Sequence, residues 1–278
     1  MKSRRQFIKA SGLTAVGAMA ATWDSKASET PIAAGNLNLA LASYTLRGFD
    51  LEQTLAMTNR VGLKNICIKS MHLAMDSSVD EINAVAEKVK AAGINLYGVG
   101  VVYMKTEGEV DQAFEYAKNA GMSVIVGVPN PELLGYTAKK AKLYGIRVAI
   151  HNHGPGDDLY PGPGDVYKKI KDLDLRMGLC VDIGHTFRIG LDPIVECEKY
   201  FDRIYDIHLK DIDYAKASGK SVEIGRGAMD IPGFLQFLTK KRFNSMVSIE
   251  YEKDGDDPLP GLAESVGYIN GVLDTLTI

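Results

Sequence analysis

The sequence predicts a (β/α)₈ TIM barrel that forms a single domain, and three observations lead to this fold class. From residue 37 onward, apolar runs of roughly six residues alternate with longer amphipathic stretches, which is typical of parallel β-strands joined by helices. Eight such runs can be counted, and no Pro-, Gly- or Ser-rich linker separates them. The 278 residues, of which 46% are hydrophobic, suffice for one barrel with one large core.

The elements follow in order along the chain. The predicted strands are residues 37–43, 65–69, 95–102, 123–128, 147–151, 177–182, 203–209 and 246–251. The predicted helices between them include residues 51–60, 79–91, 110–120, 131–144 and 231–241, and a last helix, 259–276, closes the ring. Gly62, Gly93, Gly121 and Gly145 stand where helix C-caps are expected. An open α/β sheet is the alternative, but eight strand–helix units favour a closed barrel.

The first residues are expected to be a targeting segment, and the barrel is expected to span residues 28–278. Residues 3–9 resemble the twin-arginine export motif, with Arg4 and Arg5 as the pair, and residues 13–21 form a short apolar stretch. Cleavage after residue 20 or residue 27 would follow a small-x-small pattern, and we predict residues 1–27 as an export signal. The protein is then exported, to the periplasm. An uncleaved amphipathic tail is the alternative.

The charge of the chain argues against two classes of partner. Residues 1–27 hold five basic residues and one acidic residue, so the net charge falls from −3 for the whole chain to −7 without them. Nucleic acids and anionic membranes both attract basic surfaces, so we expect neither nucleic-acid binding nor stable membrane association. The three cysteines lie in apolar contexts at long spacings and are expected to be buried thiols: Cys67, Cys180 and Cys197.

Histidines gather at the strand ends. All five lie at or just beyond the C-terminal ends of predicted strands, which is where TIM barrels carry their active sites: His72, His151, His153, His185 and His208. Side chains alternate along a strand, so residues two apart share a face. This alternation places Asp206, His208 and Lys210 on one face, and Ser248, Glu250 and Glu252 on another, with the aliphatic neighbours turned toward the helices.

Four successive strands thereby deliver His151, Asp182, His208 and Glu250 to one rim. Two imidazoles and two carboxylates suit a divalent metal ion of borderline hardness, such as Mn²⁺, Co²⁺, Zn²⁺ or Fe²⁺. A metal would also remove the repulsion between Asp182 and Glu250. The sequence therefore predicts one divalent metal ion at this rim, and a purely hydrogen-bonded polar cluster is the alternative.

Six short motifs resemble the sugar phosphate isomerase and epimerase family of xylose isomerase-like TIM barrels. They are ASYTLR at residues 42–47, IHNHG at 150–154, VDIGH at 181–185, IHLKD at 207–211, IGRGA at 224–228 and SIEYE at 248–252. The resemblance implies a ligand set of Glu, Asp, His and Glu, of which the last three map onto Asp182, His208 and Glu250. His151 stands at the first position, and residues 123–128 offer no carboxylate, which departs from the glutamate pair that epimerases of this family use.

The resemblance implies an isomerase- or epimerase-like enzyme in which a metal polarises a sugar oxygen and a base removes the neighbouring C–H proton. Glu250 or His151 is the expected proton carrier. The expected orienting or proton-transfer groups are His153, His185 and Lys210, although Lys210 could instead pair with Asp211 or Asp206. The expected substrate contacts are Lys69, His72, Glu252 and Arg226, the last as a partner for an anionic or polyhydroxyl group unless it is simply solvated.

Export bears on the substrate. Sugar phosphates are cytoplasmic metabolites, so an exported enzyme is expected to meet unphosphorylated sugars or keto-sugars. A lyase or dehydratase that acts on a 3-keto-glycoside or another oxidised sugar is the first alternative. A non-catalytic sugar-binding barrel and an endonuclease of this fold are further alternatives, and the acidic chain argues against the endonuclease.

Overall fold

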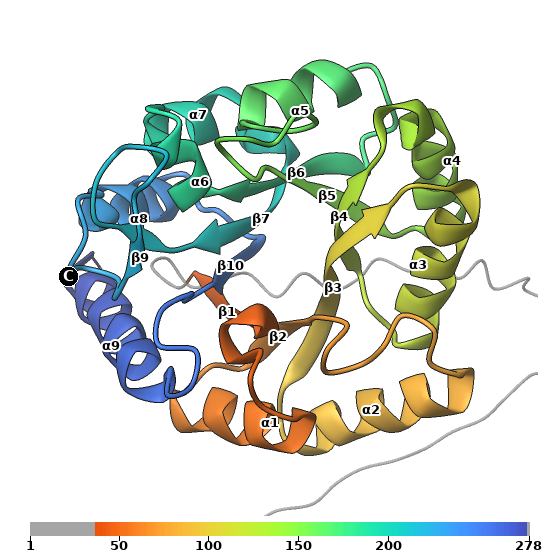
Figure 1. Ribbon diagram of the computed structural model, residues 1–278, viewed down its shortest axis with the longest axis horizontal. Helices are drawn as coiled ribbons and strands as arrows, with labels where there is room; N and C mark the ends of the chain where they lie inside the picture. The colour runs from red at the N-terminus through yellow and green to blue at the C-terminus, as the bar shows by residue number, and fades with distance from the viewer. Residues whose placement is uncertain (1–36, 277–278) are drawn as a thin grey trace, which may run out of the picture. The chain divides into compact units, whose positions relative to one another are not determined.

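A computed structural model describes residues 37–276, and these form a closed parallel barrel (Figure 1). Its strands are β1 (Asn38–Ala42), β2 (Asn65–Ile68), β3 (Asn95–Met104), β4 (Val124–Pro129), β5 (Arg147–His151), β6 (Met177–Asp182), β7 (Ile204–Leu209) and β10 (Met246–Ile249). Around the ring they follow the order β1-β10-β7-β6-β5-β4-β3-β2. The predicted (β/α)₈ fold is confirmed. The export signal predicted for residues 1–27 lies outside the described residues.

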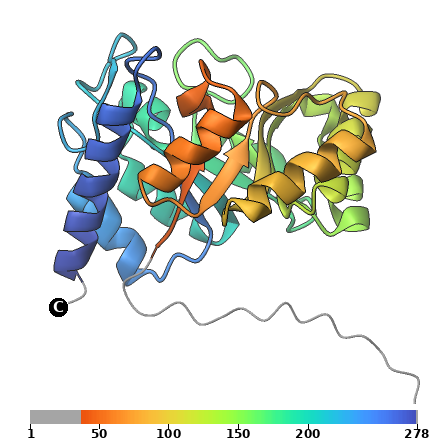
Figure 2. The same cartoon turned by 90° about the horizontal axis from the view of Figure 1, so that it is seen from below.

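Helices surround the ring of strands (Figure 1). They are α1 (Leu51–Arg60), α2 (Val79–Ala91), α3 (Glu107–Asn119), α4 (Leu134–Tyr144), α5 (Pro163–Ile170), α6 (Ile183–Arg188), α7 (Pro193–Lys199), α8 (Ile231–Lys240) and α9 (Leu259–Leu276). A small antiparallel pair, β8 (Asp211–Ile212) with β9 (Ser221–Val222), follows β7. Figure 2 shows the loops that follow the strand C-termini together on one side of the barrel.

The sequence analysis missed α5, α6 and α7. Their lengths of eight, six and seven residues are too short to show a clear helical period. α6 also begins without a loop, because the side chain of Asp182 at the end of β6 accepts the amide of His185 and caps the helix. The start of α3 lies three residues before the predicted one, since Thr106 and Glu109 form a capping box there.

The strands divide their side chains between two apolar regions, as the alternation predicts. One buried cluster contains strand residues only, among them Ala149 and Cys180, and lies inside the barrel. Leu179 and Val181, the neighbours of Cys180 in the chain, belong to the larger cluster between the strands and the helices. The cysteines are buried free thiols, as predicted: Cys67, Cys180 and Cys197. Among residues 37–276, no helix is long and apolar enough to cross a bilayer.

The four predicted C-cap glycines all have a positive φ, between 68° and 84°. At Gly145, which ends α4, φ is 70° and a Cβ would meet no atom within 4 Å, so only backbone strain opposes a side chain. We expect Gly145→Ala to lower the free energy of unfolding by about 1 kcal/mol. Gly135 in the first turn of α4 is equally open but lacks a positive φ, and Gly135→Ala should raise that free energy by about 0.5–1 kcal/mol. Urea unfolding of both variants checks this, and shifts of the same sign would contradict it.

Candidate metal centre and active site

The predicted rim residues lie together. His151 and Asp182 end β5 and β6, His208 lies near the end of β7, and Glu250 follows β10 directly. All four are buried, and one ligand atom from each lies within 4.8 Å of the others. Asp182 and His208 are register partners on neighbouring strands, which explains their proximity. Because the parallel strands end at the same height, four residues that are far apart in the chain lie in one cluster.

Donor atoms converge within this cluster. His208 Nδ1 lies 3.1 Å from His151 Nε2 and 3.2 Å from Glu250 Oε2, while His151 Nε2 lies 3.4 Å from Asp182 Oδ2. The second nitrogen of each ring, Nδ1 of His151 and Nε2 of His208, is buried without a hydrogen-bond partner among the described residues. Two imidazoles and two carboxylates that meet in this way fit a divalent metal ion of borderline hardness.

A lysine ammonium lies in the same cluster. Lys210 Nζ is fully buried and lies 2.7 Å from Glu250 Oε2, 2.9 Å from Asp182 Oδ2 and 3.1 Å from Glu252 Oε2. The sequence analysis offered Asp206 or Asp211 as its partner, and the structure corrects this. Asp206 is engaged inside the barrel with Tyr97 and Ser248, and Asp211 accepts backbone amides of the loop after β9. Lys210 therefore compensates three carboxylates that come from two strands.

The cations of the cluster keep its carboxylates ionised. Burial is the largest influence on the pKa of Asp182 and would raise it, but His185 and Lys210 outweigh burial and hold this pKa well below its usual value. The pKa of Glu250 is also well below its usual value, because Lys210 and His208 together outweigh burial. Both carboxylates are thus in the charged form that a metal ligand requires.

The two ligand imidazoles differ in charge. Burial lowers the pKa of His151 to about 3, so this ring is neutral and can donate a lone pair to a metal. Burial would also lower the pKa of His208, but Glu250 and Asp206 outweigh it and raise this pKa above its usual value. The carboxylates around His208 therefore favour a positive charge at this position, in addition to the ammonium of Lys210.

A polar cavity of about 240 Å³ opens above the cluster. Aromatic, basic and acidic side chains line it: Tyr44, Lys69, Val101, Tyr103, His151, His153, His185, Glu250 and Glu252. The structure thus brings the expected His153, His185, Lys69 and Glu252 to the same cavity as the metal-ligand candidates. Lys69 donates to the carbonyl of Val101 at 2.9 Å.

Two lining tyrosines were not predicted. Tyr44 lies in the short helical turn after β1, within a motif that the sequence analysis singled out as a whole. Tyr103 lies near the end of β3, one residue beyond the predicted end of that strand. Register shifts at both neighbours of β3 disturb the alternation, so the direction of Tyr103 could not be counted from the start of the strand.

His72 does not reach the cavity, and this corrects its expected role as a substrate contact. Its ring is buried, with Nδ1 2.9 Å from Ser43 Oγ and Nε2 3.1 Å from Thr54 Oγ1. The carbonyl oxygens of Leu46 and Phe49 also lie within 3.2 Å of Nε2. His72 therefore connects the short helical turn after β1, α1 and the loop after β2, and its contacts are structural.

Arg226 lies outside the cavity as well, so its expected contact with substrate is corrected. Its exposed guanidinium forms a two-pronged ion pair with Glu264 on α9. We expect Arg226→Gln to leave both kcat and KM of the enzyme unchanged, because surface ion pairs contribute little and the side chain lines no part of the cavity. Steady-state kinetics check this, and a raised KM would restore Arg226 as a substrate contact.

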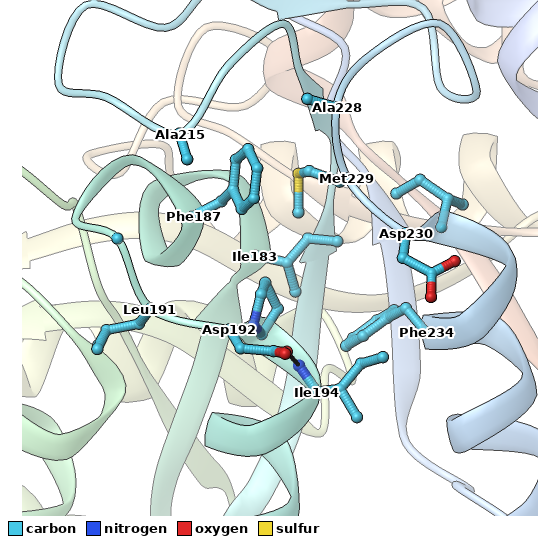
Figure 3. A pocket seen from close by; sticks show the side chains of 13 residues that line it. Ile183, Phe187, Leu191, Asp192, Ile194, Ala215, Ala228, Met229, Asp230 and Phe234 are labelled. Atoms are coloured by element: carbon cyan, nitrogen blue, oxygen red, sulfur yellow. Dashed lines mark hydrogen bonds between the residues drawn. The ribbon is translucent and has the colours of Figure 1, made fainter.

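A larger, apolar cavity of about 360 Å³ lies beside α6, α7 and α8 (Figure 3). Its walls include Ile183, Phe187 and Phe234, and its carboxylates, Asp192 and Asp230, cap α7 and α8. No histidine, lysine or arginine lines it. Side chains that can bind a metal or transfer a proton are therefore gathered at the smaller, polar cavity and not at this one.

Comparison with known sequences identifies a family that covers most of the barrel. Residues 74–271 match the sequence model of the xylose isomerase-like TIM barrel family. The rhizopine catabolism protein MocC of Rhizobium meliloti is 25% identical over 148 residues, which are 48% of this chain and 45% of MocC. Inosose dehydratase of Salmonella typhimurium is 26% identical over 140 residues, which are 44% of this chain and 46% of that enzyme. The chain matches about half the length of these curated relatives.

Solved structures share the fold. An uncharacterized protein from Parabacteroides distasonis has a TM-score of 0.68 and 28% identity, with 84% of this chain and 98% of that chain covered. A zinc-bound structure of the IolI protein has a TM-score of 0.68 and 17% identity, over 86% and 99%. The 3-keto-D-glucoside 4-epimerase of E. coli has a TM-score of 0.68 and 12% identity, over 85% and 100%. At the two lower identities the likeness shows the fold alone.

Proposed function

The chain belongs to the xylose isomerase-like TIM barrel family, and we propose that it is a metal-dependent enzyme that acts on an unphosphorylated sugar or keto-sugar. The proposed reaction removes the proton next to a carbonyl, as in an isomerase or epimerase. One observation carries the proposal: four strand ends place His151, Asp182, His208 and Glu250 within reach of a single ion on one side of a polar cavity.

A divalent metal ion held by these four side chains would polarise a carbonyl or hydroxyl oxygen of the sugar. Mn²⁺, Co²⁺, Zn²⁺ and Fe²⁺ all suit the donor set, and the zinc in the IolI structure agrees with this range. Lys210 holds Asp182 and Glu250 in their charged forms and touches Glu252 at the cavity wall. Glu250 or His151 would carry the proton, and His153, His185 and Lys69 would orient the sugar.

The size and charge of the cavity support an unphosphorylated substrate. About 240 Å³ suits one sugar ring, and Lys69 is the sole lysine or arginine among the lining residues. Phosphate sites usually combine several cations or a helix N-terminus, which this lining does not supply. The export signal proposed for residues 1–27 and a periplasmic location agree with such a substrate.

Elimination is a second candidate, and the identity of residue 151 favours it. A carboxylate on each side of the sugar would allow a proton to leave one face and return to the other, yet β5 ends in His151 and no residue of β4 is acidic. The acidic groups at the cavity wall, Glu250 and Glu252, both follow β10. A single base suffices for a dehydratase or lyase on an oxidised sugar or a 3-keto-glycoside, and an inosose dehydratase is among the relatives.

NMR in deuterated buffer separates these functions. The metal-loaded protein is incubated with a free ketose, with a keto-inositol and with an alkyl 3-keto-glucoside. Deuterium next to the carbonyl without loss of a group indicates isomerisation or epimerisation, and release of water or of the alcohol indicates elimination. Binding without either change would identify a sugar-binding barrel, and neither binding nor turnover would contradict the proposed function.

A further inference from the structure

Three side chains outside the metal cluster contact one another beside the polar cavity, and two of them, Tyr103 and His153, line it. Tyr103 near the end of β3 has its hydroxyl 3.1 Å from Nε2 of His153, which lies two residues past β5. Nδ1 of the same ring lies 3.2 Å from Oδ2 of Asp157, in the loop between β5 and α5. The rings of Tyr103 and His153 stack with centroids 5.7 Å apart.

The carboxylate of Asp157 lies beside the His153 ring and is itself held in place by backbone amides. Its Oδ1 accepts the amides of Leu159 and Tyr160, which fixes the carboxylate, and its Oδ2 faces Nδ1 of His153. The carboxylate beside Nδ1 favours a ring proton on that nitrogen, which turns the lone pair of Nε2 toward the hydroxyl of Tyr103. Burial, followed by the charge of Asp157, raises the pKa of Tyr103, so this phenol keeps its proton at neutral pH. Tyr103 can therefore donate this proton to a bound substrate once its hydroxyl turns from His153 toward the cavity.

Tyr103 belongs to the wall opposite the metal-ligand candidates of β7. In the ring of strands, β3 and β7 are four steps apart in either direction, so they face each other across the barrel. β7 carries His208, with Lys210 just after it, whereas Tyr103 lines the cavity from β3. A sugar whose carbonyl lies near the cluster would thus present another oxygen to Tyr103.

We propose that Tyr103 is the proton donor to the leaving oxygen of the substrate, held in place by His153 and Asp157, and that the reaction is the elimination of water or an alcohol from a β-oxygenated keto-sugar. This inference rests on the proposed function. The base of the site takes the proton next to the carbonyl, and the C–H electron pair becomes the new C=C bond. The C–O bond breaks toward oxygen, which takes the phenolic proton and leaves as water or alcohol. Solvent then returns a proton to the phenolate, whose residue is 52% exposed.

Tyr103→Phe separates proton donation from the earlier C–H cleavage. With an alkyl 3-keto-glucoside and a keto-inositol in deuterated buffer, we expect release of alcohol or water to fall about 100-fold or more. Deuterium next to the carbonyl of recovered substrate should persist or increase, and metal content should stay the same. Tyr136→Phe on α4 is the matched control and should behave as wild type, because it loses a hydroxyl contact to Asp111 and neither residue lines the cavity.

Asp157→Asn tests the positioning role of the carboxylate, because asparagine keeps an Oδ1 acceptor for Leu159 and Tyr160. We expect the nitrogen NMR signals of His153 to report a changed tautomer, and elimination to slow with KM unchanged. Unchanged His153 signals would overturn this role.

The other outcomes distinguish the two proposals. Wild-type protein that exchanges deuterium but releases no group would overturn the elimination while the proposed proton abstraction stands. Wild-type elimination that survives Tyr103→Phe, or a variant that loses exchange and release equally, would overturn the role of Tyr103 alone. A wild type with neither exchange nor release would overturn both.

Discussion

Lys210→Met is expected to lower the free energy of unfolding of the metal-free protein by about 3–5 kcal/mol, which is typical when one partner of a buried ion pair is removed. The ammonium is fully buried, and Asp182, Glu250 and Glu252 all lie within 3.1 Å of it. Burial alone would lower the pKa of Lys210, but these carboxylates outweigh it and raise that pKa well above its usual value. Without the ammonium, the carboxylates would repel one another in a buried site.

A divalent metal should rescue part of this loss, because it supplies a cation to Asp182 and Glu250 in place of the lost ammonium. Urea unfolding with chelator and with added Mn²⁺ measures both effects. Lys88→Met, which removes an exposed partner of Glu52 on α1, is the matched control and should change stability little. If Lys210→Met is as stable as the control with chelator present, Lys210 does not compensate the cluster as described.

Glu250→Gln is expected to reduce kcat by about 10³-fold or more, because one change removes a charged metal ligand and a candidate base. The replacement keeps the size of the side chain but not its charge. Glu250 Oε2 contacts both Lys210 Nζ and His208 Nδ1. Loss of its charge therefore also weakens the contacts of the Lys210 ammonium and of His208, a second ligand candidate. The metal affinity of the variant should fall as well.

Glu264→Gln is the control for that prediction, since Glu264 is an exposed residue of α9 that pairs with Arg226. Steady-state kinetics and metal titration by calorimetry measure the two variants side by side. Turnover in Glu250→Gln equal to that of the control would remove Glu250 from the mechanism. Turnover lost with metal affinity retained would assign Glu250 to proton transfer rather than to the metal.

The barrel and the cluster could both be predicted because each depends on a simple period. Buried parallel strands are short apolar runs, and all eight end within two residues of their predicted bounds. Once a strand is located, the alternation of its side chains tells which residues face inward. The alternation predicted that His151 on β5, Asp182 on β6 and His208 on β7 lie together, as they do in the structure.

Contacts that depend on how loops and strand ends are placed relative to one another could not be predicted. For Lys210, the alternative to an orienting or proton-transfer role was a pairing with an acid close to it in the chain, but its partners lie at the ends of β6 and β10. His72 follows a strand like the other histidines, yet its loop turns the ring toward Ser43 and Thr54. Tyr103 lies on β3, where a register shift interrupts the alternation of side chains, so the direction of its side chain could not be predicted from the sequence.

The central claim is that His151, Asp182, His208 and Glu250 hold one divalent ion that the reaction needs. The most direct test measures the metal content of the purified protein by mass spectrometry, together with turnover of the keto-sugar before and after chelation. The account predicts one divalent ion per chain, loss of turnover with its removal and recovery when it is restored. A protein that is free of metal and fully active would contradict the account.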